Sequence, residues 1–498
     1  MTGSTPGGLE PVTICQPGAV TSDPVDEAGR STVVVVGAGI AGLAAAWALS
    51  GGPSPVRVVV LEGAAQVGGK LALGDVDGLV VDLGAESMLA RRPEALVLAR
   101  AVGLGEDLVT PRPVGASVWS RGALRPLPPG TLMGVPSGPD GLLGLLTPEE
   151  TAQVVAEPGT EWPASAADVD VASFVAGRVG AGVVDRLLDP LLGGVYAGRS
   201  DELSLQATVP ALWAAATQGA SVVAAARAAS VAGTATRTPV FAGVRGGVGR
   251  LPLAVAAALR ERGVEVVTDS TVRELRRTPV GWRLTLGSTT HAQVVDADGV
   301  VLATPAAPTS RLLADAAPVA ATLLAQVEYA SVAIVTVLVP RSAAGPLVGS
   351  GFLVPAVEGR FVKAATFSSS KWAWLDGSDP DRVALRTSVG RHRDEADLQR
   401  DDADVVARAV ADLGGLLGGP LPVLASTVTR WGGALPQYAV GHLTRVASVR
   451  AALTGSPGLA VAGAAYDGVG IPACIASGTA AALAVGTHLE QRAQGARG

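Results

Sequence analysis

The chain has 498 residues, of which 48% are hydrophobic and 16% are charged, and its formal net charge at pH 7 is −6. This length exceeds what one hydrophobic core usually holds, so a globular protein of two or three domains is expected. The acidic balance argues against a nucleic-acid partner, but it does not argue against a local basic pocket.

Composition also bears on the compartment. Cys15 and Cys474 are the only cysteines, so there is no disulfide framework, as expected in a reducing cytoplasm. Residues 1–30 are rich in Gly, Pro, Thr and Asp and lack the basic and apolar regions of a signal peptide, which predicts a disordered tail. No uninterrupted strongly apolar run reaches spanning length, which predicts no transmembrane anchor and leaves peripheral membrane contact open.

The cationic residues are almost all arginine. Lys70, Lys363 and Lys371 are the only lysines, a bias that we attribute to the codons of a GC-rich genome rather than to function. The four histidines are scattered without metal-ligand spacing, so no metal site is predicted.

The first predicted elements carry the most specific motif of the chain. A β-branched run suited to a buried strand leads into a glycine-rich turn, an Ala-rich helix and a second valine-rich strand. In order, these parts are Val33–Val36, the pattern G-x-G-x-x-G at Gly37, Gly39 and Gly42, Leu43–Leu49, and Val56–Leu61, which ends at Glu62.

Each part of this unit has a physical task in dinucleotide binding. Gly37 permits the tight turn, Gly39 lets a pyrophosphate approach the backbone, and Gly42 lets helix and strand pack closely. The helix N-terminus offers unpaired N–H groups to the pyrophosphate, and Glu62 can accept hydrogen bonds from a ribose diol. The unit therefore predicts dinucleotide binding, and the alternative is a merely structural glycine turn.

The next segments add two glycine loops and a hairpin. Gln66–Lys70 is a Gly-Gly loop that ends in a cation, and Leu79–Ser87 is a short strand running into a glycine turn. Ala116–Leu127 is typical of a hairpin turning at Arg121-Gly122. The breaker-rich stretch Pro128–Pro139 marks a boundary.

From Leu142 to Ala235 the pattern becomes helical. Asp170 is placed to cap a helix that contains Phe174. Trp213–Ala232 is nearly uncharged and Ala-rich, which favours a well-packed helix, with contact to a membrane surface as the alternative.

The remaining chain contains mainly predicted strands, and its end repeats the strand, glycine turn and helix of the first unit. A helix (Leu251–Arg262) and two strands (Val264–Val267 and Gly299–Ala303) come first. β-Branched runs between Val327 and Val389 then predict a separate antiparallel sheet. At the end, the strand Leu459–Val461, a Gly-rich turn and the helix Ile475–Val485 predict a second piece of the nucleotide-binding domain.

The chain resembles the flavin-containing amine oxidase superfamily, and within it the FAD-dependent coproporphyrinogen III and protoporphyrinogen oxidases. The resemblance extends from Thr32 to Leu489. It rests on the motifs VVVVGAGIAGLAAAWAL, LEGAAQVGGKL, DLGAESM, PLLGGVYAG, FAGVRGGVGRLP, RWGGALPQYAVGH and VAGAAYDGVGIPACIASG.

The resemblance implies an α/β fold with a discontinuous Rossmann-type FAD-binding domain, an inserted α+β substrate domain and a helical domain. The expected boundaries are 31–105, 240–308 and 441–498 for the FAD-binding domain, 106–132 and 309–440 for the substrate-binding domain, and 133–239 for the helical domain.

It also implies noncovalent FAD, since Cys474 lacks the surrounding motif of covalently flavinylated relatives and is expected to pack in the core. For Lys70 and Trp431, a solvated loop lysine and a core tryptophan are the alternatives to cofactor contact. The implied cofactor-binding residues are Gly37, Ala38, Gly39, Ile40, Ala41, Gly42, Glu62, Gly63, Lys70, Gly84, Ala85, Glu86, Ser87, Val272, Trp431, Val469, Gly470 and Ile471.

The implied reaction is oxidation of coproporphyrinogen III to coproporphyrin III, with dioxygen as the final oxidant. Protoporphyrinogen IX is the alternative substrate, because the flavin machinery would be the same. An amine oxidase or desaturase is less favoured, because five Phe, four Tyr and eight Trp leave little for an aromatic cage. A non-enzymatic prenyl-protein escort is disfavoured by the intact glycine loop and Glu62. No motif requires a catalytic base, and oligomeric state is not determined by sequence.

Coproporphyrinogen III has four propionates, so cations are expected around its binding site. In some family members a cation precedes the hairpin turn, but the matching position here is Ala116. The candidates near predicted cofactor or substrate segments, each with surface solvation as the alternative, are Arg91, Arg92, Arg125 and Arg245.

Overall fold

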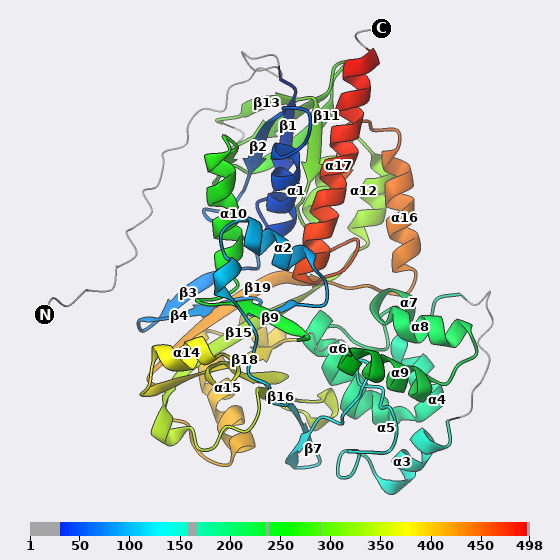
Figure 1. Cartoon of the computed structure of the whole chain (residues 1–498), viewed down its shortest axis with the longest axis vertical. Helices are drawn as coiled ribbons and strands as arrows, with labels where there is room; N and C mark the ends of the chain where they lie inside the picture. The colour runs from blue at the N-terminus through cyan, green and yellow to red at the C-terminus, as the bar shows by residue number, and fades with distance from the viewer. Residues whose placement is uncertain (1–29, 158–166, 236–238, 289, 496–498) are drawn as a thin grey trace, which may run out of the picture.

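The computed structural model describes residues 30–157, 167–235, 239–288 and 290–495. The predicted tail, apart from Arg30, lies outside these ranges. Three regions are visible in Figure 1: a parallel sheet with long helices in the upper part, a second sheet at lower left, and a group of helices at lower right.

The upper region is built on a five-stranded, all-parallel sheet with the order β10-β2-β1-β14-β20. All five strands were predicted, and their existence is confirmed. Their bounds are Glu265–Val267 (β10), Arg57–Leu61 (β2), Thr32–Val36 (β1), Gly299–Leu302 (β14) and Leu459–Val461 (β20).

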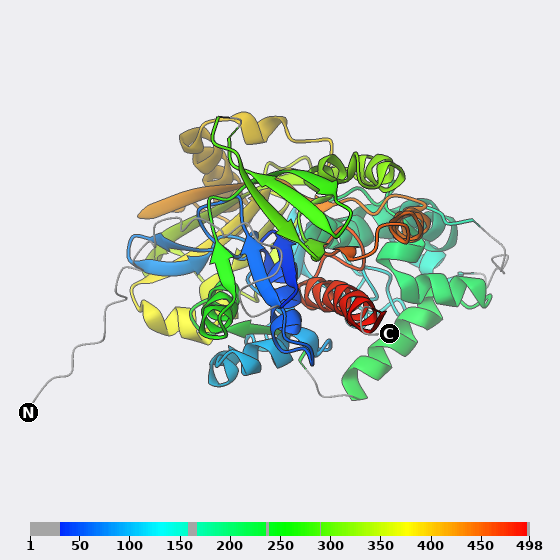
Figure 2. The same cartoon turned by 90° about the horizontal axis from the view of Figure 1, so that it is seen from above.

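This sheet is buried on both faces, which explains its valine runs. Alternate residues enter opposite cores: Val33 and Val35 pack on one side, and Val34 and Val36 pack on the other. One face is covered by α1 (Ile40–Ser50), α10 (Arg250–Glu261) and α17 (Ile471–Gly495). The other face is covered by a three-stranded sheet of β11 (Val272–Arg277), β12 (Trp282–Leu286) and β13 (Gln293–Ala297), as Figure 2 shows from above.

The second sheet has seven strands in the order β19-β15-β18-β17-β16-β7-β8. The runs predicted as an antiparallel sheet do pair antiparallel. The whole sheet is mixed, because β16 also pairs in parallel with β7 of the predicted hairpin. Helix α15 (Asp402–Leu417) packs on its outer face. The strand bounds are Ala425–Pro436 (β19), Tyr329–Pro340 (β15), Arg382–Val389 (β18), Ala364–Phe367 (β17), Gly351–Leu353 (β16), Ser117–Ser120 (β7) and Ala123–Pro126 (β8).

Two local predictions in this part of the chain are confirmed. The hairpin of β7 and β8 turns at Arg121 (φ 53°) and Gly122 (φ 78°), as a two-residue type I′ turn requires. In the helical region, the Asp170 side chain accepts a hydrogen bond from the Ser173 N–H at 2.7 Å and caps α4 (Val171–Val179).

The Ala-rich segment Trp213–Ala232 is two helices instead of the single one predicted. α8 (Pro210–Thr217) ends before Gly219 (φ +70°), and α9 (Val222–Ala235) begins anew. The Glu157 carboxylate accepts hydrogen bonds from the Val222 and Val223 N–H groups, at 2.7 and 3.0 Å. The carboxylate of a residue distant in sequence thus caps the N-terminus of α9.

Within the described residues, one helix is long and apolar enough to cross a membrane by length and composition. This is α17, which starts four residues before the predicted helix and runs ten residues beyond it. More than half of its apolar window is buried inside the protein. It packs on α1 so closely that a Cβ at Gly478 would lie 2.0 Å from the Ala41 carbonyl oxygen.

Shorter elements complete the fold. Two small sheets are formed by β3 and β4, and by β5, β9 and β6. Their strands are Leu73–Val76 (β3), Leu79–Asp82 (β4), Met88–Leu89 (β5), Leu108–Val109 (β6) and Phe241–Val244 (β9). The remaining helices include α2 (Glu94–Ala101), α3 (Pro148–Val155), α6 (Asp189–Tyr196), α7 (Leu205–Thr208), α11 (Ala306–Leu313), α12 (Pro318–Ala325), α13 (Ser368–Lys371), α14 (Ala373–Ser378) and α16 (His442–Leu453).

Candidate active site

A cavity of about 1070 Å³ lies where the carboxyl ends of β1, β2 and β14 face the seven-stranded sheet. Open parallel sheets bind ligands outside the carboxyl ends of their strands. The opposite wall comes from β15, β17, β18 and β19. On β15, Val332 and Ile334 line the cavity, whereas Ala333 and Val335 enter the core beneath the sheet. Because side chains alternate between the two faces of β15, the face toward the cavity forms an apolar wall.

The glycine loop between β1 and α1 forms one end of the cavity. Gly37 has φ +102°, and a Cβ at Gly42 would lie 1.9 Å from the Gly37 carbonyl oxygen, so both positions need glycine for the fold itself. At Gly39 a Cβ would meet no atom within 4 Å. Gly39 is the N-cap of α1, and no side chain caps this helix. Open space therefore faces the free N–H groups of a helix start, which fits a pyrophosphate.

Glu62 follows β2 and faces the same loop. Its carboxylate accepts hydrogen bonds from the Ala38 N–H at 2.6 Å and the Ala64 N–H at 2.9 Å, through different oxygens. Each oxygen retains a further lone pair. The carboxylate is therefore oriented by the backbone and can still accept from a pair of hydroxyl groups.

Glu86, in the turn after β4, belongs to a buried ionic cluster. Its carboxylate accepts from the Lys371 ammonium at 2.6 Å, the Arg386 guanidinium at 2.8 Å and the Ser368 hydroxyl at 3.1 Å. Burial alone would raise the pKa of Glu86, but the two cations outweigh it and lower the pKa to about 2. Arg386 also donates to the Gly84 carbonyl oxygen at 2.6 Å. The cluster ties the Gly84–Ser87 turn to β18 and α13.

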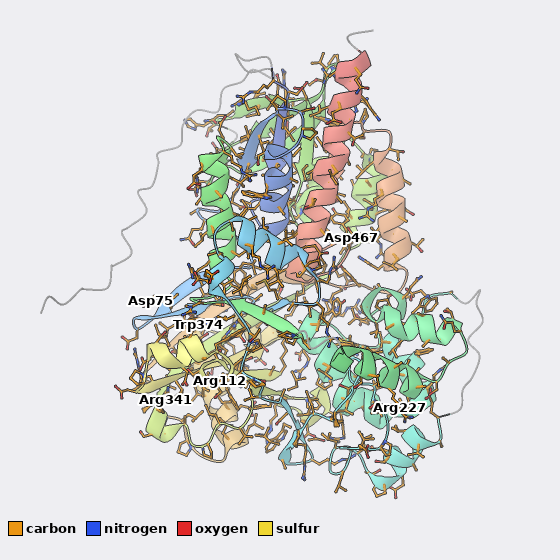
Figure 3. The ribbon with its side chains drawn as sticks, viewed as in Figure 1. Asp75, Arg112, Arg227, Arg341, Trp374 and Asp467 are labelled. Atoms are coloured by element: carbon orange, nitrogen blue, oxygen red, sulfur yellow. The ribbon has the colours of Figure 1, made fainter. Side chains whose placement is uncertain are left out.

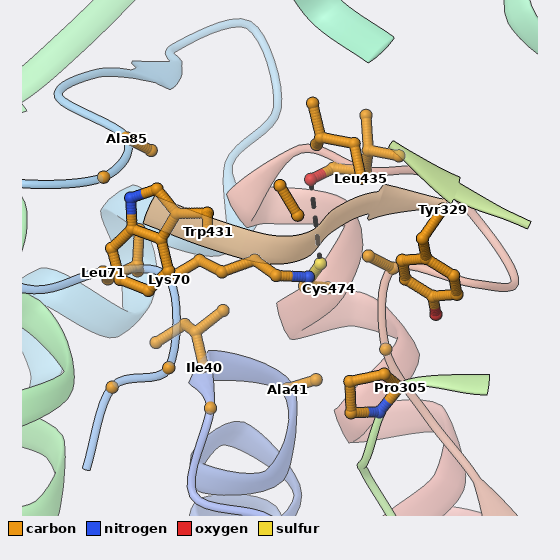
Figure 4. Close-up of a pocket in the computed structure, with 18 of the residues that line it drawn as sticks. Ile40, Ala41, Lys70, Leu71, Ala85, Pro305, Tyr329, Trp431, Leu435 and Cys474 are labelled. Atoms are coloured by element: carbon orange, nitrogen blue, oxygen red, sulfur yellow. Dashed lines mark hydrogen bonds between the residues drawn. The ribbon is translucent and has the colours of Figure 1, made fainter. Parts of the chain in front are cut away.

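Lys70 extends across the cavity toward Cys474 and Tyr329, with Trp431 beside its aliphatic part (Figure 4). The Lys70 Nζ atom lies 5.6 Å from the centroid of the Tyr329 ring, and burial lowers the pKa of this lysine. Burial raises the pKa of the Cys474 thiol to about 11. Cys474 is therefore a neutral thiol at pH 7, not a thiolate nucleophile.

Two further contacts close the cavity around the predicted cofactor segments. The Trp431 indole N–H donates to the Leu83 carbonyl oxygen at 3.0 Å and holds β19 against the Gly84–Ser87 turn. The Tyr438 hydroxyl accepts from the Gly468 N–H at 2.8 Å and fixes the loop before α17. The N-terminus of α17 consequently opens on the cavity, where its partial positive charge suits an electron-rich ligand.

The cavity brings together almost all of the predicted cofactor-binding residues. Of these, Ala38 and Gly42 alone do not line it, and both belong to the glycine loop. Val272, at the start of β11, lines it with Ser270, Thr271 and Arg273. In the described part of the chain, no group of three or more His, Cys, Asp or Glu side chains is placed to hold a metal ion.

The four arginines predicted to bind substrate carboxylates do not line the cavity. Arg92 pairs with Glu94, and Arg245 lies 3.7 Å from Asp107. Arg125 is on β8, the edge strand of the seven-stranded sheet, and Arg91 is exposed. The sequence indicates only that their segments lie near predicted cofactor or substrate segments, and the structure places these four side chains away from the cavity.

Sequence reasoning missed the cations that do line the cavity. They are Lys363, Lys371 and Arg386 on the seven-stranded sheet side, and Arg273 and Arg311 on the parallel-sheet side. All three lysines of the chain are therefore cavity residues. The rarity of lysine was the available signal, and we had attributed it to codon bias alone.

Comparisons with known proteins agree with this geometry. Residues 40–486 match the sequence profile of the family described as flavin containing amine oxidoreductase. The coproporphyrinogen III oxidase of Mycobacterium leprae (strain TN) is 37% identical over 447 residues, which cover 89% of this chain and 95% of the relative. The protoporphyrinogen oxidase of Bos taurus is 30% identical over 500 residues, covering 92% of this chain and 99% of that protein.

Among solved structures, a protein from Exiguobacterium sp. 255-15, provisionally named a protoporphyrinogen oxidase, superposes with a TM-score of 0.79 at 29% identity. The superposition covers 95% of this chain and 100% of that one. The mixed α/β fold is thus shared over nearly the whole length.

Proposed function

This chain belongs to the flavin containing amine oxidoreductase family, and we propose that it oxidises coproporphyrinogen III to coproporphyrin III. The macrocycle loses six electrons and six protons, and three dioxygen molecules become three hydrogen peroxide molecules. The protein is an FAD-dependent oxidase. When bound, FAD supplies hydride acceptance from carbon and electron transfer to dioxygen.

We assign FAD to a discontinuous Rossmann-type domain of residues 31–105, 240–308 and 441–498. The inserted α+β substrate domain comprises 106–132 and 309–440, and the helical domain 133–239. The five-stranded parallel sheet, which draws strands from all three FAD-binding segments, supports this division. The buried neutral thiol of Cys474 supports noncovalent attachment of the cofactor.

The residues of the chain would act by binding, orienting and excluding water. The glycine loop and Glu62 would hold the pyrophosphate and the ribose. The cluster of Glu86, Lys371 and Arg386 would keep the Gly84–Ser87 turn against the seven-stranded sheet, and the apolar face of β15 would position the macrocycle. No side chain is assigned as a catalytic base.

One observation carries the choice of coproporphyrinogen: buried cations stand on the cavity wall opposite the cofactor cradle. Coproporphyrinogen III carries four carboxylates, whereas protoporphyrinogen IX carries two and replaces the others with apolar vinyl groups. Protoporphyrinogen IX is the second candidate. It is supported by the apolar residues of β15 and by the 30% identity to the Bos taurus enzyme.

The test is to purify the protein, measure its FAD content, and supply each porphyrinogen in turn. Porphyrin fluorescence and peroxide are followed together, and the expected ratio is three peroxide molecules for each coproporphyrin. A protein that cannot be loaded with FAD would overturn the assignment as a flavoenzyme. Faster turnover of protoporphyrinogen IX than of coproporphyrinogen III would reverse the order of substrates.

A further inference from the structure

Lys363 is a buried cation at the end of the cavity formed by the seven-stranded sheet and α6. Its side chain is 7% exposed. Its N–H donates to the Ser388 carbonyl oxygen, and its carbonyl oxygen accepts from the Val354 N–H, both at 2.9 Å. The residue is therefore held by the strands around it, and its position does not depend on a loose loop.

The chain just before β17 presents the Lys363 side chain to the cavity. Val362 and Ala365 both belong to the core beneath the sheet, whereas Lys363 and Ala364 both line the cavity. Lys363 directly precedes β17, so the strict alternation of side chains begins only at Ala364 and both residues can face the cavity.

Within the described ranges, the Lys363 ammonium has no ion pair with a carboxylate, and no opposite charge acts on its pKa. The charged group that acts on it is the Arg391 guanidinium, which donates to the Val354 carbonyl oxygen at 2.9 Å and is itself attracted by Asp189 and Asp394. Burial, with a smaller contribution from Arg391, lowers the pKa of Lys363 to about 7. A buried cation beside a second cation is costly unless an anion completes the site.

Lysine is rare in this chain and is found only in this cavity. Only three of the 38 Lys and Arg residues are lysines, and all three line this cavity. Lys371 is paired with Glu86, and Lys70 lies over the Tyr329 ring beside the glycine loop. Lys363 alone has no partner among these contacts.

We propose that Lys363 binds a carboxylate of the substrate and makes the enzyme select macrocycles that carry a carboxylate at this end of the cavity. The inference rests on the proposed function, since a porphyrinogen is the substrate class. Gly193 and Gly194 of α6, which carry no side chain, line the same cavity, and Gly194 lies beside Leu353 on the strand next to Lys363.

The test compares the holoenzyme with its Lys363→Met and Lys363→Arg variants. The matched control is Arg227→Met, which removes a positive charge on the outside of the helical region (Figure 3), away from the cavity. Two stable probes are used: coproporphyrin III, with four carboxylates, and its tetramethyl ester, with none. Binding is measured by porphyrin fluorescence, together with FAD content and the KM for coproporphyrinogen III.

Lys363→Met is expected to weaken coproporphyrin III binding by about ten- to hundredfold, as the loss of a charged hydrogen bond does. Binding of the tetramethyl ester and FAD content should stay as in the wild type. Lys363→Arg should retain most of the preference for the free acid, and Arg227→Met should retain all of it.

Equal losses for the acid and the ester, or no loss for either, would overturn the proposal. If Lys363→Met fails to fold, the Lys363→Arg variant and Lys363→Gln provide the same comparison of acid with ester. A wild type that prefers the acid through Lys363 but does not oxidise coproporphyrinogen III would support the carboxylate site and refute the proposed reaction. If the wild type oxidises coproporphyrinogen III but Lys363→Met has an unchanged KM, the proposed reaction would be supported and the carboxylate site refuted.

Discussion

Two alanine substitutions in the glycine loop separate its role in folding from its role in cofactor binding. Gly39→Ala and Gly42→Ala add the same methyl group three residues apart. At Gly39 the backbone (φ −67°, ψ 170°) suits alanine, and the methyl carbon meets no atom within 4 Å. At Gly42 the methyl carbon would lie 1.9 Å from the Gly37 carbonyl oxygen and 3.1 Å from the Ala303 Cβ.

The magnitudes follow from these contacts. Gly42→Ala must push apart the start of α1 and the end of β14, which costs about 1–3 kcal/mol of stability for an overpacked site. Gly39→Ala restricts the unfolded chain without strain in the folded one, so its stability should be unchanged or raised by up to about 1 kcal/mol. Its methyl group stands where the pyrophosphate would approach, and we expect FAD affinity to fall by about tenfold or more, or roughly 1.4 kcal/mol.

The assay has two stages. Urea unfolding of the FAD-free proteins measures stability, and titration of the same preparations with FAD, followed by flavin fluorescence, measures affinity. Gly42→Ala should unfold earlier than the wild type, whereas Gly39→Ala should unfold with it or later and bind FAD poorly. Wild-type FAD affinity in Gly39→Ala would refute the placement of the pyrophosphate. A wild-type unfolding midpoint in Gly42→Ala would refute the packing argument.

Three other predictions address the rest of the cavity. Glu86→Gln leaves the Lys371 and Arg386 cations buried without their anion, which should cost about 3–5 kcal/mol of stability and lower FAD retention. Thermal melts would detect this, and adding Lys371→Met should restore part of the loss, whereas unchanged melting would contradict the ionic cluster. Because the pKa of Lys363 falls from its ordinary 10.5 to about 7, the unfolded chain binds more protons between these values, and wild-type stability should rise with pH across that window. Lys363→Met should therefore be more stable than the wild type, by at most about 5 kcal/mol below pH 7 and by nothing above pH 10.5. Urea unfolding at pH 6 and pH 10 measures this difference in stability. If the stability of the two proteins changes equally with pH, the buried position of the Lys363 ammonium is contradicted. Because Cys474 is a protonated thiol, acid precipitation should leave all flavin in the supernatant, and flavin that stays in the pellet of the wild type but not of Cys474→Ala would show a covalent bond.

Sequence reasoning succeeded where the chemistry is local. The glycine loop, the Arg121-Gly122 turn and the Asp170 cap each depend on a few consecutive residues, whose allowed dihedrals and hydrogen bonds are readable in the chain. The five parallel strands were also readable, because burial on both faces demands an uninterrupted apolar run.

It failed where partners are far apart in the chain. The Glu86–Lys371 pair spans 285 positions, and only the packing of the turn after β4 against α13 creates it. The N-terminus of α9, the second of the two Ala-rich helices, is likewise capped by Glu157, which lies more than sixty positions before it. The substrate arginines were misplaced for the same reason, because nearness in sequence was taken for nearness in space.

The parallel sheet has a consequence for how the protein acquires its cofactor during synthesis. β20 pairs with β14, and α17 packs on α1 through Gly478, so the cofactor cradle needs residues beyond 459 to reach residues 32–50. Contacts between such distant segments form late and slowly. A nascent chain on the ribosome therefore exposes the glycine loop long before it can enclose a ligand. We expect FAD capture to mark the end of translation and chains truncated before α17 to stay colourless.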